Sequence, residues 1–159
     1  MRRLIRVAAA AGGAVLAALA AAGCSAAHAS GPAIAVPAAY VQLPGSTNST
    51  VGYLDIRNNG TADQLVSVRT SVGGTVQLRA PVRPGASPIT FHTVPDIPVA
   101  ANAMTQLIPD SYHLLITGAG PMQDGKDIRL TLTFARSGSI TILALVTNPE
   151  SGGSSYFLN

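Results

Sequence analysis

Turn-forming residues interrupt this chain so often that long regular helices are excluded from its central part. Glycine occurs 16 times and proline 11 times among 159 residues. Proline removes a hydrogen bond from a helix and clashes with the preceding turn, and glycine destabilises a helix interior. Beyond residue 50 the apolar residues fall into short segments between these breaks, without a helical period. We therefore expect an all-β domain.

Eight short segments with strand-like patterning lie between turn signals. The clearest alternates apolar and polar residues from Ile128 to Phe134, and Asn58-Asn59-Gly60 is a strong turn signal after the first predicted strand. The predicted strands cover residues 50–57, 64–70, 75–79, 89–94, 104–108, 113–116, 128–134 and 139–146. Short strands joined by close turns predict a single antiparallel β-sandwich domain of the cupredoxin or immunoglobulin type.

The N-terminal segment has the features of an export signal. Arg2, Arg3 and Arg6 precede an uncharged apolar stretch over residues 7–22, which is shorter than the about 20 residues that span a bilayer. A basic start, a short apolar stretch and small residues before a break are typical of a secretory signal peptide. We therefore predict that the protein is exported from the cytoplasm.

The end of this signal indicates a lipid anchor. Ala21-Ala22-Gly23-Cys24 resembles a bacterial lipobox, after which the cysteine is lipidated and becomes the N-terminus. We predict a lipoprotein signal peptide over residues 1–23, lipidation of Cys24, and attachment to the outer face of the cell membrane. The alternative is an ordinary signal peptide cleaved near Ala27-His28-Ala29, which would remove Cys24.

Charge and cysteine content exclude several classes of function. Removal of the signal takes away three arginines, so that seven basic residues remain against seven acidic ones. A balanced charge gives no basic surface for nucleic acid, and we predict no nucleic-acid partner. The single cysteine excludes an internal disulfide and a cysteine-clustered zinc site.

The composition divides the mature chain into three parts. Residues 24–38 are rich in small residues and contain Gly31-Pro32 and Pro37, as in a flexible tether. Residues 39–147 form the predicted domain. Residues 148–159 are predicted to be a flexible C-terminal tail that hangs free unless Tyr156-Phe157-Leu158 docks on the domain.

The order of motifs along the domain resembles the PCu(A)C family of periplasmic copper chaperones. The resemblance extends over about residues 39–146, and each motif is weak when taken alone. The matching segments are Gly52-Tyr53-Leu54-Asp55-Ile56, Asp63-Gln64-Leu65, Val76-Gln77-Leu78, Ile97-Pro98-Val99-Ala100, Tyr112-His113-Leu114-Leu115 and Asp124-Gly125-Lys126-Asp127 with the strand after it. The resemblance implies a β-rich fold, copper as the cargo, and a copper-acceptor protein as partner.

The copper motif of that family is only partly present. It consists of a His, a Met twelve positions later, and a His-x-Met twenty-two positions after that Met. Aligned on His113, it places Arg79, Phe91 and Leu115 where the family has His, Met and Met. Cu(I) prefers thioether and imidazole ligands, whereas Phe and Leu have no lone pairs and Arg stays protonated. The resemblance therefore implies a site that is weak or dead for Cu(I).

An altered ligand set is a second interpretation. His92 follows Phe91 and could join His113, because two imidazoles suit Cu(II) or Zn(II). Strand alternation weighs against it, since His92 would point away from the side of Phe91. His28 in the predicted tether could add a third ligand. The alternatives are that His92 is a surface residue and that His113 is a structural hydrogen-bonding residue.

The remaining candidates give no catalytic site. Met104 and Met122 lie away from the family's ligand positions and are typical of core packing. Asp110, Ser111 and His113 are residue types of a catalytic triad, but their proximity in a predicted turn does not create triad geometry. We predict a non-enzymatic copper chaperone-like lipoprotein that binds copper through His113. The alternative is a metal-free binding or scaffold lipoprotein that has lost the copper site.

Overall fold

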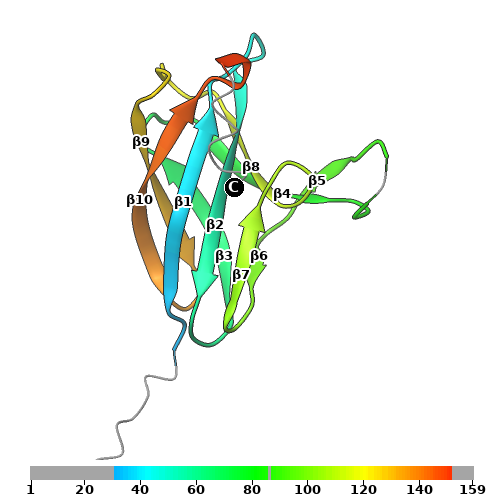
Figure 1. Cartoon of the computed structure of the whole chain (residues 1–159), viewed down its shortest axis with the longest axis vertical. Helices are drawn as coiled ribbons and strands as arrows, with labels where there is room; N and C mark the ends of the chain where they lie inside the picture. Colours follow the sequence, from blue (N-terminus) through cyan, green and yellow to red (C-terminus); the bar gives the residue numbers. More distant parts are fainter. Residues whose placement is uncertain (1–30, 86, 152–159) are drawn as a thin grey trace, which may run out of the picture.

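A computed structural model describes residues 31–85 and 87–151, and the predicted signal peptide, Cys24, His28 and residues 152–159 lie outside them. The described part consists of ten strands and one short 3-10 helix (Figure 1). These elements are β1 (Ile34–Gln42), β2 (Ser49–Asn58), β3 (Asp63–Thr70), β4 (Thr75–Pro81), β5 (Phe91–Thr93), β6 (Ile97–Val99), β7 (Ala103–Leu107), β8 (His113–Thr117), β9 (Asp127–Phe134), β10 (Gly138–Thr147) and η1 (Pro149–Ser151). The prediction of an all-β fold is confirmed. Within the described ranges, no helix has the length and apolar character needed to cross a membrane.

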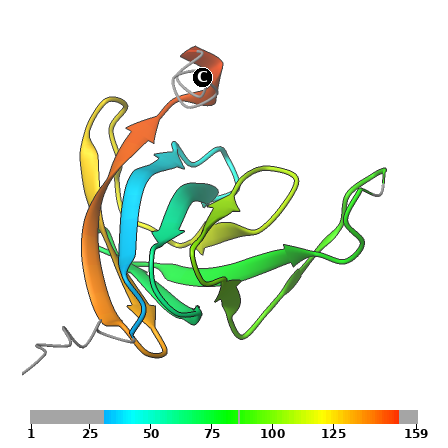
Figure 2. The same ribbon diagram turned by 60° about the horizontal axis from the view of Figure 1, so that its bottom comes forward.

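The strands form one mixed sheet that curls into a half-barrel. Their order is β5-β4-β8-β2-β1-β10-β9-β3-β6, and β7 also pairs with β2. The first part of β2 pairs with β8 and its last part with β7. Figure 2 shows the strands curving around the core, with the β4–β5 hairpin projecting from one side. The curled sheet replaces the two separate sheets that a simple sandwich would have.

One strand pair departs from the predicted antiparallel arrangement. β1 and β10 run parallel, with Tyr40 opposite Leu145 and Gln42 opposite Thr147. The other pairs are antiparallel. The first and last strands of the domain can lie side by side in parallel because the whole domain serves as the connection between them.

Two strands were not predicted from the sequence. β1 begins at Ile34, so residues 34–38 belong to the sheet and not to the predicted tether. Its pairing with β2 shifts register between Ala35 and Ala38, where a bulge accommodates Pro37. β6 is a three-residue edge strand with Pro98 at its centre. Proline in a short segment argues against a strand, and both strands form through tertiary pairing.

Buried Asn58 fixes the start of β1 against the turn after β2. Its Oδ1 accepts hydrogen bonds from the Ala33 and Gly60 amides, each at 3.0 Å. Its Nδ2 donates to the carbonyl oxygens of Thr61 and Ala100 at 2.7 and 3.1 Å. The side chain that the sequence marked as part of a turn signal therefore joins three backbone segments, at Ala33, at Gly60-Thr61 and at Ala100.

Alternation along the strands separates a core face, which we call the inner face, from an outer face. In β9 the residues Leu130, Leu132 and Phe134 are buried, while the polar residues between them are not. They pack in one cluster with apolar residues of the neighbouring strands. In β8, Leu114 and Ile116 point into this core, so His113 and Leu115 belong to the outer face.

Candidate functional site

The positions aligned with the copper motif come together on the outer face. Arg79 of β4 lies directly opposite His113 of β8 in the sheet register. Phe91 of β5 lies opposite Pro81 of β4. Pro81 comes two residues after Arg79 and faces the same side of the sheet, so Phe91 lies on that side too. Leu115 follows His113 by two residues and faces the same way. The alignment on His113 thus identified four residues that share one surface.

Arg79 is fixed in place by two hydrogen bonds. Its Nη1 donates to Thr93 Oγ1 at 2.9 Å and its Nη2 to the Phe91 carbonyl at 2.8 Å. The Thr93 hydroxyl in turn donates to Gln77 Oε1 at 3.2 Å. A permanent positive charge is therefore held on β4 opposite His113, where the resemblance places a metal ligand.

The His113 ring is enclosed by aromatic neighbours. Its centroid lies 4.4 Å from that of Phe91 in an edge-on arrangement and 6.4 Å from that of Tyr53. The Tyr53 ring also packs against that of Tyr40 of β1, tilted by 44° at a centroid distance of 5.1 Å. Phe91, His113, Tyr53 and Tyr40 therefore form a row across the outer face. His113 is only 7% exposed although it points away from the core.

The His113 ring stays neutral more readily than a histidine in water. Burial lowers its pKa below the ordinary 6.5, the hydrogen bond to Ser111 opposes this effect, and the positive charge of Arg79 lowers the pKa again. Nδ1 lies 3.3 Å from the Ser111 carbonyl. A carbonyl only accepts, so Nδ1 carries the proton and Nε2 retains the lone pair.

The structure does not bring the other predicted ligands to His113. His92 lies opposite Ala80 in the register and is exposed, and its strand neighbours Phe91 and Thr93 face Arg79. Strand alternation therefore directs His92 to the other side of β5. Met104 lies on β7 opposite Arg57, and Met122 packs on the core. Among the described residues, no three His, Cys, Asp or Glu side chains gather closely enough to hold a metal ion.

The residues around His113 do not fit Cu(I) in the manner that the resemblance implies. Phe91 and Leu115 replace two thioethers with hydrocarbon, and the guanidinium of Arg79 repels a cation. One imidazole nitrogen, His113 Nε2, remains as a donor. The sequence revealed these replacements but not Tyr53 and Thr93. Nothing in the sequence indicated that β2 pairs with β8, or that Thr93 lies opposite Arg79.

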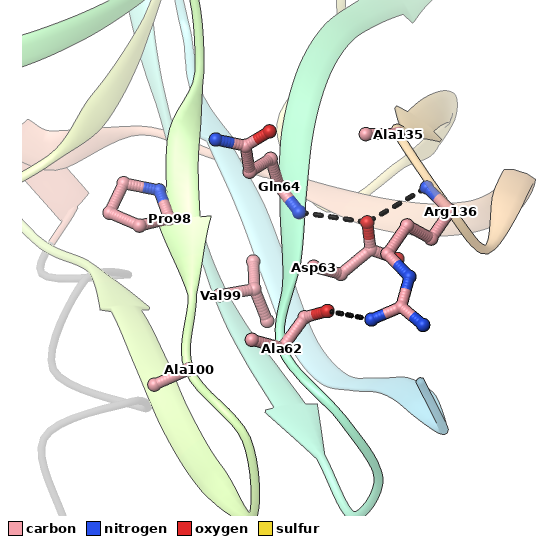
Figure 3. A pocket seen from close by; sticks show the side chains of 8 residues that line it. All are labelled: Ala62, Asp63, Gln64, Pro98, Val99, Ala100, Ala135 and Arg136. Carbon is pink, nitrogen blue, oxygen red and sulfur yellow. Dashed lines mark hydrogen bonds between the residues drawn. The ribbon is translucent and has the colours of Figure 1, made fainter. Parts of the chain in front are cut away.

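A hollow lies at the far edge of the sheet, around the start of β3 and the end of β9. It has a volume of about 450 Å³, and Figure 3 shows the side chains that line it: Ala62, Asp63, Gln64, Pro98, Val99, Ala100, Ala135 and Arg136. Arg136 Nη1 donates to Thr61 Oγ1 and to the Ala62 carbonyl at 3.0 and 2.9 Å. This guanidinium therefore ties the β9–β10 turn to the segment before β3.

Asp63, which lines this hollow, has a structural role. Its carboxylate accepts hydrogen bonds from the Gln64, Arg136 and Ser137 amides at 2.8–2.9 Å and from the Ser137 hydroxyl at 2.6 Å. Burial by itself raises the pKa of Asp63, but the hydrogen bonds, that of the Ser137 hydroxyl first, lower it below its ordinary value. These hydrogen bonds hold the β9–β10 turn against the start of β3, and we call them the Asp63 clasp. Because both carboxylate oxygens are used in this way, Asp63 is a poor candidate for catalysis.

Comparisons with known proteins agree with this architecture. The family model described as "Putative lipoprotein LpqE-like" matches residues 34–146. None of the curated proteins matches the chain. Solved PCuAC domains are similar in structure. The apo PCuAC domain from PmoF1 has a TM-score of 0.63 at 20% identity, covering 73% of this chain and 94% of that domain.

Two further solved structures with a similar fold are copper-bound proteins. The copper-bound PCuAC domain from PmoF2 has a TM-score of 0.59 at 18% identity, covering 73% of this chain and 93% of that one. The solution structure of CuI-DR1885 from Deinococcus radiodurans has a TM-score of 0.61 at 22% identity, covering 77% and 83%. These likenesses show that the chain has the fold of PCuAC domains.

Proposed function

The chain belongs to the LpqE-like family, and from this premise we propose that it is an extracytoplasmic, lipid-anchored protein that uses a copper-chaperone fold to bind a partner protein and does not carry Cu(I). The observation that carries this proposal is Arg79. Its guanidinium is held by two hydrogen bonds where the resemblance places a copper ligand, opposite His113. A fixed cation beside a buried neutral imidazole disfavours a metal ion and leaves a polar and aromatic surface for a partner.

The proposed location rests on the family and on the N-terminal sequence. The family description names a lipoprotein, and Ala21-Ala22-Gly23-Cys24 follows a basic and apolar signal. A lipid on Cys24 would hold the domain on the outer face of the cell membrane. Substitution Cys24→Ala should move the protein from the detergent phase to the aqueous phase in detergent partitioning. A wild-type protein that partitions into water would contradict the anchor.

Copper binding through His113 is the second candidate function. It is supported by the neutral ring and by the free lone pair on Nε2. In this version His113 binds Cu(II) or Zn(II) with water, or with His92 or His28 after rearrangement, and passes the metal to an acceptor protein. The position of His92 on the other side of β5 weakens this candidate.

Both candidates describe a binding protein and not an enzyme. Ser111 contacts His113 through its backbone carbonyl and not through its hydroxyl. A nucleophile needs its own oxygen within hydrogen-bond reach of the base. The arrangement at residues 110–113 therefore supports the proposal that the protein acts without catalysis.

Cu(I) titration against a colorimetric chelator tests whether the Cu(I) site is lost. The wild type should not compete for Cu(I), whereas Arg79→His, Phe91→Met and Leu115→Met together should create a Cu(I) site with His113. The matched control is the same triple variant with His113→Ala, which should lose the gain. Tight Cu(I) binding by the wild type that disappears with His113→Ala would overturn the proposal that the protein does not carry Cu(I).

Titration with Cu(II) and Zn(II) tests the altered ligand set separately. If His113 and His92 both ligate, each single alanine variant should weaken binding, and binding should weaken as the pH falls through about 6, because imidazole must be neutral to ligate. We expect that neither His113→Ala nor His92→Ala changes the Cu(II) or Zn(II) titration of the wild type.

A further inference from the structure

The guanidinium of Arg79 is placed to bind an anion from outside the chain. Within the described residues its hydrogen bonds go to two neutral acceptors, the Thr93 hydroxyl and the Phe91 carbonyl. A guanidinium presents more N–H groups than these bonds use, and the Arg79 side chain is partly exposed on β4. The two bonds fix the group in place. A fixed guanidinium with neutral partners is matched to a carboxylate, which accepts two parallel hydrogen bonds from it.

The strands around Arg79 carry positive charge only. The segment over residues 75–94, which forms the β4–β5 hairpin, contains Arg79 and Arg83 and no Asp or Glu. β8, which pairs with β4, contains no acidic residue either. This end of the outer face is therefore positive, although the mature chain as a whole has balanced charges. Complementary potentials steer a partner to such a place and fix its orientation.

Negative charge acts at the other end of the aromatic row. Burial raises the pKa values of Tyr40 and Tyr53, and the charges of Asp55 and Asp110 respectively add to this rise. A carboxylate on a partner is therefore repelled from the Tyr40 end of the row and attracted to the Arg79 end. The charges on the outer face distinguish the two ends of anything that lies along it.

A small hollow, which we call the Leu115 hollow, lies near Arg79 on the outer face. It has a volume of about 280 Å³ and lies between the end of β1, the start of β2 and the helix η1. Its apolar wall is formed by Leu43, Val51, Leu115 and Pro149. Arg79 lies opposite His113, and Leu115 follows His113 by two residues. Arg79 and Leu115 are therefore diagonal neighbours across two strands, about 7–8 Å apart.

The size of the Leu115 hollow suits one side chain of a polypeptide. Sites for small-molecule ligands have about 300–1,000 Å³ and bury most of the ligand. The hollow is smaller, at about 280 Å³, and one large apolar side chain fills it better. Alternate side chains of an extended segment point the same way and repeat about every 7 Å. This repeat matches the spacing from Arg79 to Leu115, so one extended segment can reach both.

We propose that this part of the outer face binds an extended segment of a partner protein, in which an acidic residue pairs with the Arg79 guanidinium and a large apolar side chain two positions away enters the Leu115 hollow. The inference rests on the proposed function and names the chemistry of the partner. The charge that repels a metal cation then attracts the partner. Arg79 thus turns the position of a metal ligand into a protein-recognition residue.

A peptide titration of the full mature chain, followed by NMR of the Val51 and Leu115 methyl groups, tests the proposal. The probe is the peptide acetyl-Glu-Thr-Phe-amide. Replacement of its glutamate by glutamine should weaken binding to the wild type about tenfold, because a charge-assisted hydrogen-bonded pair is lost. The same replacement should have no effect on binding to Arg79→Gln, as expected for two groups that interact directly. The matched control Arg83→Gln, on the exposed part of the same hairpin, should behave as the wild type does.

The two peptides also test the proposal on the wild type alone, without any protein variant. Equal affinity for the glutamate and glutamine peptides, or no binding of either at millimolar concentration, would overturn it. Replacement of the phenylalanine of the peptide by serine should abolish the methyl shifts of Leu115. Unchanged Leu115 shifts with the serine peptide would show that the apolar side chain does not enter the hollow and would overturn the proposal.

Two further outcomes separate this inference from its alternatives. Methyl shifts that grow with protein concentration in the absence of peptide, and vanish in Arg79→Glu, would assign the surface to a second copy of the chain and overturn the proposal. Cu(I) binding by the wild type would overturn the proposed function whatever the peptide does. Peptide affinity that does not depend on Arg79 would overturn this inference alone.

Discussion

On the inner face of β8, Leu114 and Ile116 are 0% and 1% exposed in an apolar core, whereas on its outer face His113 is 7% exposed among groups of different chemistry. The inner residues are buried by other aliphatic side chains. His113 is buried by aromatic rings, a backbone carbonyl and the neighbourhood of Arg79. His113 and its neighbours Leu114 and Ile116 are therefore buried to nearly the same extent, but in two different chemical environments.

This difference explains how the fold can persist while the site changes. The inner face needs apolar side chains of matching volume, because interiors are closely packed. The outer face needs only groups that cover His113, and Phe91 does so without a sulfur atom. The fold of PCuAC domains can thus be kept with Arg79, Phe91 and Leu115 at the positions that the resemblance assigns to ligands.

Truncation of matched leucines should show the largest contrast. Leu132→Ala, fully buried on the inner face, should lower the free energy of unfolding by about 2–5 kcal/mol. Leu115→Ala on the partly exposed outer face should cost about 1 kcal/mol or less, as for many surface substitutions. Denaturant unfolding with a common slope measures both. Equal losses of unfolding free energy would show that the outer face stabilises the fold as much as the core does.

Substitution of Asp63 tests how much the Asp63 clasp contributes to the free energy of unfolding, in comparison with apolar packing. Asp63→Asn weakens charge-assisted hydrogen bonds to Arg136 and Ser137 and should cost about 1.5–3 kcal/mol. The folded pKa of Asp63 is below the ordinary 3.8, so its stabilisation is complete above about pH 3.8 and is lost as the pH falls through the folded pKa. Unfolding at several acid pH values should show this loss in the wild type and less of it in Asp63→Asn. An unchanged acid profile would contradict the clasp.

The smallest expected effect is a change in the pKa of His113 when the charge of Arg79 is removed. Its folded pKa is below 6.5, so the stability that its neutral ring contributes is complete above about pH 6.5 and is lost as the pH falls through the folded pKa. Arg79→Gln removes a positive charge and should raise the pKa of His113, as followed by NMR of the imidazole. Arg83→Gln on the exposed hairpin is the control and should leave it unchanged. A lower pKa in Arg79→Gln would show that the charge of Arg79 does not act on the ring.

The sequence contained enough to predict most strands and the inner face. Alternation from Ile128 to Phe134 predicted β9 and its buried residues, because each strand carries the period of the sheet in its own residues. β1 could not be predicted in this way. Its Pro37 is tolerated at a bulge against β2, and that bulge depends on the partner strand. The parallel pairing of β1 with β10 likewise joins residues about a hundred positions apart.

The positions of the site could be predicted from the motif spacing that the resemblance supplies, but the contacts around them could not. Spacing from His113 identified Arg79, Phe91 and Leu115, and alternation correctly weighed against His92 on the side of Phe91. The covering of His113 by Tyr53 and the fixing of Arg79 by Thr93 depend on which strands become neighbours. Such contacts follow from topology, which short-range patterns do not contain.

The parallel pairing of β1 and β10 also places the two ends of the domain's chain at opposite ends of the sheet. β1 has nine residues, which extend over about 30 Å, and β10 runs in the same direction, so the chain enters at one end of the sheet and leaves at the other (Figure 1). A lipid on Cys24 would attach the end near Ile34. Gln42, Thr147 and the row from Tyr40 to His113 would then face away from the membrane surface. A membrane-embedded partner would reach this row most directly through a part that projects above the headgroups.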